Sequence, residues 1–251
     1  MARMILDIES AGVPFESLDE VSQEYYKKFA RRDAADEAEY EALLEEHKNA
    51  LAFSPLTAET VAIGMLNPET GKGIVTYQAP KKEPAPSSAE GYSLSGVEGF
   101  EEEGVQFLPK SEREMLVYFW EAVRQYDQVI TFSGRAFDVP FLLARSAIHE
   151  VLPTKNLMPN RYKGTAHIDL MDHLTFFGAV RKTGFGLHFW ARALGVESPK
   201  AGEVHGEDVT RLFHAGEYEK IARYCLGDLK ATTALWERWS KYYAMQGEER
   251  W

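Results

Sequence analysis

The chain contains very little cysteine. Cys225 is the only cysteine among its 251 residues, which excludes an intrachain disulfide and a zinc site built from several cysteines. A protein that needs no disulfide suits a reducing compartment. We therefore expect a cytoplasmic protein.

Long apolar runs are also missing. No stretch of about 18 apolar residues is present to form a membrane-spanning helix. Residues 1–6 are too short for the apolar part of a secretion signal, and acidic residues follow them directly. We therefore expect no membrane partner. Hydrophobic residues still make up 45% of the chain, which is enough for a sizeable core.

Positive charge is scarce over the chain as a whole. The formal net charge is −11, which on its own argues against a nucleic-acid partner. The acid excess lies in residues 1–130, which hold 12 lysines and arginines against 25 acids, whereas residues 131–200 hold 9 against 5. This basic middle is either ordinary surface variation or a contact surface for phosphates.

The first half of the chain predicts strands around a helical insertion. Residues 16–50 are rich in helix formers and contain no glycine or proline. Their early apolar residues recur at three- to four-residue spacing, which predicts one buried helical face. That face consists of Leu18, Val21, Tyr25 and Phe29. Residues 60–66 and 73–78 predict a hairpin, and the Pro-, Ser-, Gly- and Glu-rich residues 79–108 predict a long surface loop.

The second half predicts alternating strands and helices. Ser111 and Glu114 form the signature of a capping box at the start of a helix. Strands at 128–132 and 166–170 flank a helix at 138–149, and further helices are expected at 171–177, 187–194, 206–214 and 217–243. The chain is therefore predicted to be a single α/β domain over residues 1–251. Its five-stranded mixed sheet would be flanked by helices, with residues 16–56 inserted after the first strand.

Two acids stand at the end of the first apolar strand. Residues on a strand alternate between its faces, so Asp7 and Glu9 share a face while Ile8 points the other way. Two neighbouring carboxylates at the end of a buried strand are costly unless they are neutralised, and a hard divalent cation accepts such oxygens. The alternative is a strand end at which both acids are solvated.

Further acids stand in apolar surroundings later in the chain. Asp138 precedes an apolar helix, as a ligand or as a simple N-cap. Tyr224 and Asp228 lie one helical turn apart, so the phenol and the carboxylate meet; the alternative is a half-buried tyrosine beside a surface acid. His167 and Asp169 share a strand face and are expected to be supporting polar residues.

Together, these motifs resemble the DEDD superfamily of 3′→5′ exonucleases. The resemblance is to its tyrosine-bearing (DEDDy) branch, and more closely to stand-alone relatives of the proofreading exonuclease domain of family B DNA polymerases. Residues 5–9, 130–142 and 224–228 resemble the first, second and third exonuclease motifs. The resemblance covers nearly the whole chain, although the second motif often has Asn where this chain has Ser133.

The resemblance implies a ribonuclease H-like fold and a site for two divalent metal ions, Mg²⁺ or Mn²⁺. The metal ligands would be Asp7, Glu9, Asp138 and Asp228. These four acids and Tyr224 would be the catalytic residues, with the tyrosine orienting the attacking water. Two such ions activate the water and stabilise the leaving oxygen in phosphodiester hydrolysis.

The implied substrate is the 3′ end of single-stranded nucleic acid, with DNA favoured. Substrate-binding residues are expected in the first and second motifs: Ile8, Ser133, Gly134, Arg135, Phe137 and Phe141. Candidate phosphate contacts in the basic middle are Arg135, Lys155, Arg161, Lys163, Arg181 and Lys182. Two alternatives stay open, an exoribonuclease of the same superfamily and a catalytically silent nucleic-acid-binding module. The sequence indicates no particular protein partner.

Overall fold

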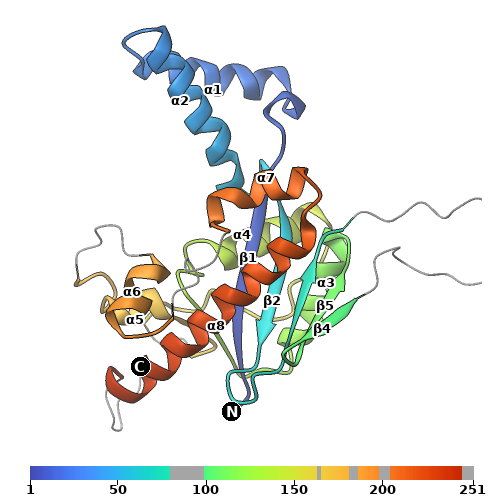
Figure 1. The fold of residues 1–251 in the computed structure, drawn as a ribbon, viewed down its shortest axis with the longest axis vertical. Coiled ribbons are helices and arrows are strands. Elements are labelled where there is room, and N and C mark those ends of the chain that lie inside the picture. The colour runs from blue at the N-terminus through green and yellow to red at the C-terminus, as the bar shows by residue number, and fades with distance from the viewer. Residues whose placement is uncertain (80–98, 163–164, 181–185, 198–203, 245–251) are drawn as a thin grey trace, which may run out of the picture.

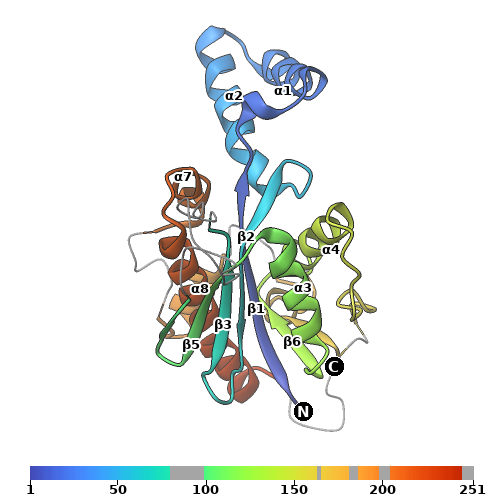
Figure 2. The ribbon, with the colours of Figure 1, turned by 90° about the vertical axis from the view of Figure 1, so that its right-hand side faces the viewer.

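A mixed seven-stranded sheet runs through the molecule (Figures 1 and 2). The structure is a computed structural model that describes residues 1–79, 99–162, 165–180, 186–197 and 204–244. The strand order is β4-β5-β3-β2-β1-β6-β7. The strands are β1 (Arg3–Gly12), β2 (Ala58–Leu66), β3 (Gly73–Tyr77), β4 (Phe100–Glu102), β5 (Val105–Pro109), β6 (Gln128–Thr131) and β7 (His167–Asp169).

Strand β1 holds the centre of the sheet. It pairs antiparallel with β2 and parallel with β6, and β6 pairs parallel with β7. The predicted β2–β3 hairpin is confirmed, and its turn ends at Gly71, whose φ of 70° favours glycine. The mixed sheet is therefore present as predicted, with parallel strands on one side of β1 and the hairpin on the other.

The predicted strand count of five was wrong. Residues 99–108 were assigned to a surface loop, but they contribute β4 and most of β5. Val105 and Phe107 alternate with exposed residues and are buried, and the ring of Phe107 stacks on Phe100 at a centroid distance of 4.5 Å. The alternation of buried and exposed residues in these strands is short, and the surrounding Gly- and Glu-rich composition obscures it in the sequence. The rest of the predicted loop, residues 80–98, lies outside the described residues.

Helices cover both faces of the sheet, as Figure 2 shows. Helices α3 and α4 pack on one face over a core that includes Met4, Leu6 and Ile8, whereas α7 and α8 pack on the other over Ile5 and Ala11. The predicted capping box at Ser111 and Glu114 is confirmed. The α-helices of the body are α3 (Glu112–Val123), α4 (Asp138–Ile148), α5 (Leu170–Leu174), α6 (Leu187–Ala193), α7 (Val209–His214) and α8 (Tyr218–Tyr242). No helix in these described ranges is long and apolar enough to cross a bilayer.

The insertion after β1 forms a helical arm of α1 (Glu20–Asp33) and α2 (Glu37–Ala50), which projects beyond the end of the sheet (Figures 1 and 2). The helices were predicted correctly, but their buried face was not. Val21 is 80% exposed and Tyr25 is 58% exposed. The arm reaches past the body, so no other described element covers this face.

Helix α8 approaches the sheet closely because β2 has glycine at position 64. A Cβ atom on Gly64 would lie 2.6 Å from Cδ1 of Leu229 and 2.7 Å from Sγ of Cys225. Gly64 is also the register partner of Asp7 on β1. This glycine therefore sets the distance between α8 and the first of the two acids of β1.

We expect Gly64→Ala to destabilise the protein by about 1 to 3 kcal/mol, because α8 must move away from β2. Gly227→Ala provides the matched control, since a Cβ there meets no atom within 4 Å and alanine favours the interior of α8 by up to about 1 kcal/mol. Urea unfolding of both variants tests the pair. Equal stability of wild type and Gly64→Ala would contradict the packing described here.

Candidate metal and nuclease site

Strand β1 directs Asp7 and Glu9 toward α8, as the alternation of strand residues predicts. Ile8, between them, is buried on the opposite face with the α3–α4 core. The register of β1 against β2 shifts directly after Glu9, and such bulges often re-aim side chains beside functional sites. A carboxylate oxygen of each acid and Sγ of Cys225 all lie within 4.8 Å of one another.

Helix α4 brings Asp138 to the same place. The N-cap of α4 is Phe137, and Asp138 is the first residue of the helix. The N-cap role considered for Asp138 is therefore wrong. The side chain is buried, and hydrogen bonds from its own backbone and from the backbone of Ile8 lower its pKa against the larger effect of burial. The bond to Ile8 ties the start of α4 to β1 between Asp7 and Glu9.

Helix α8 supplies Tyr224 and Asp228, which share one face as predicted. The side chains of these two residues are hydrogen-bonded to each other. Between them in sequence, the thiol of Cys225 points to the sheet and donates a weak hydrogen bond of 3.8 Å to the backbone oxygen of Asp7. Helix α8 is therefore fixed against β1 at the level of the acids.

The four acids act on one another electrostatically in a poorly hydrated place. Burial raises the pKa of Asp7 and of Glu9 well above their ordinary values, and repulsion from the other carboxylates raises both further. Burial also raises the pKa of Asp138 to about 7. The interacting acids are Asp7, Glu9, Asp138 and Asp228. Such a cluster is costly unless protons or cations neutralise it.

The donor set fits hard divalent cations. Oδ2 of Asp7 and Oε1 of Glu9 are inaccessible to water and have no hydrogen-bond partner among the described residues. Buried polar atoms without a partner are rare, and a bound ion is one arrangement that satisfies them. In the metal-free protein burial and the nearby carboxylates raise the pKa of the Cys225 thiol well above its usual range. The carboxylate oxygens of the site are the ligands that hard divalent cations prefer.

Residues 94–251 match a protein family described as predicted 3′-5′ exonuclease related to the exonuclease domain of PolB. The chain belongs to this family. The match includes Asp138, Tyr224 and Asp228, whereas Asp7 and Glu9 precede it. The fold therefore brings Asp7 and Glu9, which lie outside the matched residues, next to Asp138 and Asp228 within them.

The fold is also similar to that of a family B DNA polymerase from the hyperthermophilic archaeon Pyrobaculum calidifontis, with a TM-score of 0.56 and 17% sequence identity. The similarity covers 95% of this chain and 24% of the polymerase chain. At this identity the likeness establishes the fold alone, and it confirms the predicted ribonuclease H-like α/β architecture. The search of curated proteins returned no match.

Asp169 supports the second motif of this exonuclease-family chain. Its carboxylate accepts hydrogen bonds from the backbone amides of Ser133, Arg135 and Met171. Ser133 has a φ of 63°, a left-handed conformation that serine rarely adopts and that the asparagine often found here tolerates better. A Cβ on Gly134 would lie 2.4 Å from Oγ1 of Thr131, so only glycine fits that position.

His167 is a structural residue beside this turn. Its ring is hydrogen-bonded to Oγ1 of Thr131 and to the backbone oxygen of Leu157. Burial lowers the pKa of His167 to about 4, which keeps the ring neutral. The expectation that His167 and Asp169 are supporting polar residues is confirmed by these bonds.

All three of the expected phosphate contacts that the structure describes have intramolecular partners. Arg161 forms a two-pronged ion pair with Asp172, and Arg135 donates to the backbone oxygen of Pro159. Lys155 donates to the backbone oxygen of Tyr126. The other candidates, Lys163, Arg181 and Lys182, lie outside the described residues.

The aromatic side chains divide between the core and the site. Phe141 is 1% exposed and lies in the core, whereas Phe137 is half-buried beside Asp138. Phe53, at the foot of the helical arm, is 68% exposed and lies 6.4 Å from Phe137 between ring centroids. No pattern in the sequence predicted a role for Phe53, because only the fold brings the end of the insertion to the second motif.

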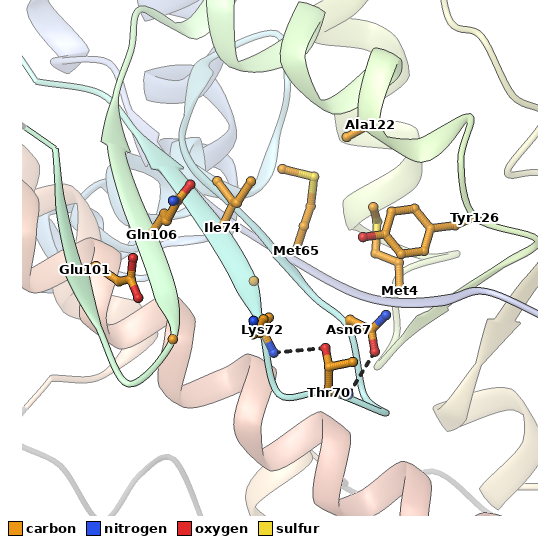
Figure 3. Close-up of a pocket in the computed structure, with 12 residues that line it drawn as sticks. Met4, Met65, Asn67, Thr70, Lys72, Ile74, Glu101, Gln106, Ala122 and Tyr126 are labelled. Atoms are coloured by element: carbon orange, nitrogen blue, oxygen red, sulfur yellow. Dashed lines mark hydrogen bonds between the residues drawn. The ribbon is translucent and has the colours of Figure 1, made fainter.

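A separate pocket of about 430 Å³ lies beside the turn of the β2–β3 hairpin (Figure 3). Met4, Met65 and Ile74 line it from the strands, and Tyr126 lies across from them after α3. It contains neither the four acids nor Tyr224. It is therefore distinct from the carboxylate site.

We expect the free energy of unfolding of the metal-free protein to fall between about pH 4 and about pH 7. The folded pKa of Asp138 is about 7 against an ordinary 3.8, so in this range the folded protein holds a proton that the unfolded chain has lost. This stabilisation is complete below the ordinary pKa and is lost as the pH passes the folded pKa. Urea unfolding in EDTA at several pH values measures it.

Asp138→Asn should reduce the slope of this pH dependence, because the amide does not ionise, whereas Asp7 and Glu9, whose pKa values are also raised, keep part of it. Glu197→Gln, a change at an exposed side chain, is the control and should keep the wild-type slope. An unchanged slope in Asp138→Asn would contradict the assignment of the shift to this residue.

Proposed function

We propose that the protein is a metal-dependent 3′→5′ exonuclease that hydrolyses phosphodiester bonds at the 3′ end of single-stranded nucleic acid, with DNA favoured. The observation that carries this proposal is the convergence of carboxylates from β1, α4 and α8 with two buried oxygens that lack hydrogen-bond partners among the described residues. Family membership agrees with the reaction class. In this proposal residues 1–251 are one catalytic domain with the helical arm inserted.

Four acids would hold two divalent ions, Mg²⁺ or Mn²⁺. Asp7 is the central ligand, because the other three acids all raise its pKa by repulsion. The other ligands are Glu9, Asp138 and Asp228. When bound, such ions lower the pKa of the attacking water and stabilise the developing charge on the leaving 3′ oxygen.

Tyr224 would orient the attacking water. The phenol is fixed by its hydrogen bond to Asp228. Burial and the acids raise the pKa of Tyr224, so the phenol keeps its proton. A neutral phenol can donate to a water or phosphate oxygen, which makes orientation its role.

The substrate strand would meet the second motif. The turn at residues 133–135 leads into α4, which begins at Asp138, and Phe137 at its N-cap offers a ring for the terminal base. Ile8 can contribute only through its backbone, because its side chain is buried. Phe53 extends this aromatic surface from the arm.

Asp7→Asn and Asp138→Asn should each reduce nuclease activity by about a thousandfold or more, because a ligand charge at the reacting centre is lost. The assay follows a 5′-labelled single strand with Mg²⁺ or Mn²⁺, so that shortening from the 3′ end is read directly. Glu197→Gln should retain wild-type activity. Full activity of either asparagine variant would refute the site, and parallel time courses on matched DNA and RNA strands decide the preferred sugar.

Tyr224→Phe should lower kcat by about tenfold to a hundredfold, the range typical of lost positioning contacts at metal sites. The carboxylates remain, so calorimetric titration should give the wild-type affinity for Mn²⁺. Turnover at the wild-type rate would show that the phenol only fills space. A protein that binds no Mn²⁺ would instead favour a silent nucleic-acid-binding module.

A further inference from the structure

A small aromatic pocket lies between the end of α8 and the turn that follows α5. Its volume is about 270 Å³. Six of its lining residues carry rings, and they come from the loop before β7, from α5 with the turn after it, and from the end of α8: Tyr162, His173, Phe176, Phe177, Trp239 and Tyr243. Phe176 is 52% exposed and Tyr162 is 60% exposed, so ring faces remain open to solvent at the pocket.

The backbone holds the two phenylalanines in a costly conformation. Phe176 has a φ of 48°, Phe177 has a φ of 56°, and Gly178 continues the left-handed run at 96°. Bulky residues with positive φ are uncommon and cost about 1 to 3 kcal/mol each. The turn is fixed by backbone hydrogen bonds from Phe177 to Asp172 and from Val180 to Thr175. This turn places the rings of Phe176 and Phe177 in the lining of the pocket and not in the core beneath it.

The rings form a connected set around the pocket. Phe176 stacks on Tyr243 at a centroid distance of 5.3 Å with an interplanar angle of 27°. Phe177 lies 5.0 Å from Tyr162 and 5.2 Å from His173. The phenol of Tyr243 donates to the backbone oxygen of Leu174, which fixes the end of α8 against α5.

The pocket and the carboxylate site share one face of α8. Trp239 follows Asp228 by 11 residues on this helix, which is about three full turns, so both side chains leave the helix in nearly the same direction. The two positions are about 16 Å apart along the axis. Figure 1 shows α5 beside the C-terminal half of α8, and the rings of His173 on α5 and Trp239 on α8 lie 5.2 Å apart between centroids.

A chain of contacts also joins the pocket to the second motif. Arg135, in the motif turn, lies 4.0 Å from Asp172 on α5, and Asp172 pairs with Arg161. The neighbours of this pair, Tyr162 and His173, both line the pocket. The largely buried Arg135 and the partly exposed Arg161 therefore lie between the second motif and the open rings of the pocket.

We propose that this pocket stacks a base of the same single strand whose 3′ end occupies the carboxylate site, several nucleotides upstream of the scissile bond. This inference rests on the proposed function for the route of the strand. A span of about 16 Å corresponds to about five stacked nucleotides. Every base presents a π-face, so open aromatic rings bind single strands with little sequence preference.

The test compares substrates that can and cannot span this distance. A trinucleotide reaches the carboxylates alone, whereas a 12-nucleotide strand also reaches the pocket. Replacing the two open rings in the double variant Tyr162→Leu/Phe176→Leu should raise the KM for the 12-nucleotide strand by about tenfold, within the range for loss of base stacking. The kcat for that strand and the rate on the trinucleotide should stay at wild-type values.

Binding in EDTA separates this inference from the proposed function. The double variant should bind the 12-nucleotide strand about tenfold more weakly by fluorescence anisotropy, with an unchanged dependence on salt because no phosphate contact is lost. This measurement needs no hydrolysis. A wild-type protein that binds the strand but hydrolyses nothing with Mg²⁺ or Mn²⁺ would refute the proposed function and leave the pocket supported.

Tyr25→Leu is the matched control, since Tyr25 is a comparably exposed ring on the distant arm; it should change neither measurement. If the double variant fails to fold, Tyr162→Leu alone carries the test. Equal binding of wild type and variant, or equal losses on the trinucleotide and the 12-nucleotide strand, would overturn the inference.

Discussion

The main physical constraint in this structure is the repulsion between four carboxylates in a poorly hydrated place. Burial and repulsion from neighbouring carboxylates, Asp228 among them, disfavour the charged forms of Asp7, Glu9 and Asp138. A fold that brings such groups together loses stability unless protons or cations compensate. In our proposal the compensating cations are also the catalytic ones. The repulsion that destabilises the metal-free fold therefore also provides affinity for divalent ions.

The body of the protein is arranged to maintain this convergence. Strand β1 is central and can accept α4 on one face and α8 on the other. Gly64 lets α8 lie close enough for the thiol of Cys225 to contact the backbone of Asp7. Asp169 organises the turn before α4 through the backbone amides of Ser133 and Arg135. These residues contribute no ligand in our proposal, yet the positions of the ligands depend on them.

Local periodicity allowed part of this site to be predicted from the sequence. Alternation along β1 correctly separated Asp7 and Glu9 from Ile8, and helical spacing correctly joined Tyr224 to Asp228. No local pattern predicts that three segments about 100 residues apart will converge, and only the family resemblance supplied that expectation. The exposure of Tyr25 and the place of Phe53 were missed, because both depend on how far the arm extends from the sheet. Strands β4 and β5 were missed because they are too short to outweigh their loop-like composition.

The central claim is that four carboxylates form one site for two ions. A crystal grown with Mn²⁺ and measured near the manganese absorption edge tests it directly. The account predicts two anomalous peaks about 3.5 to 4 Å apart, enclosed by Asp7, Glu9, Asp138 and Asp228. Manganese bound elsewhere, or the absence of any peak between these side chains, would contradict it.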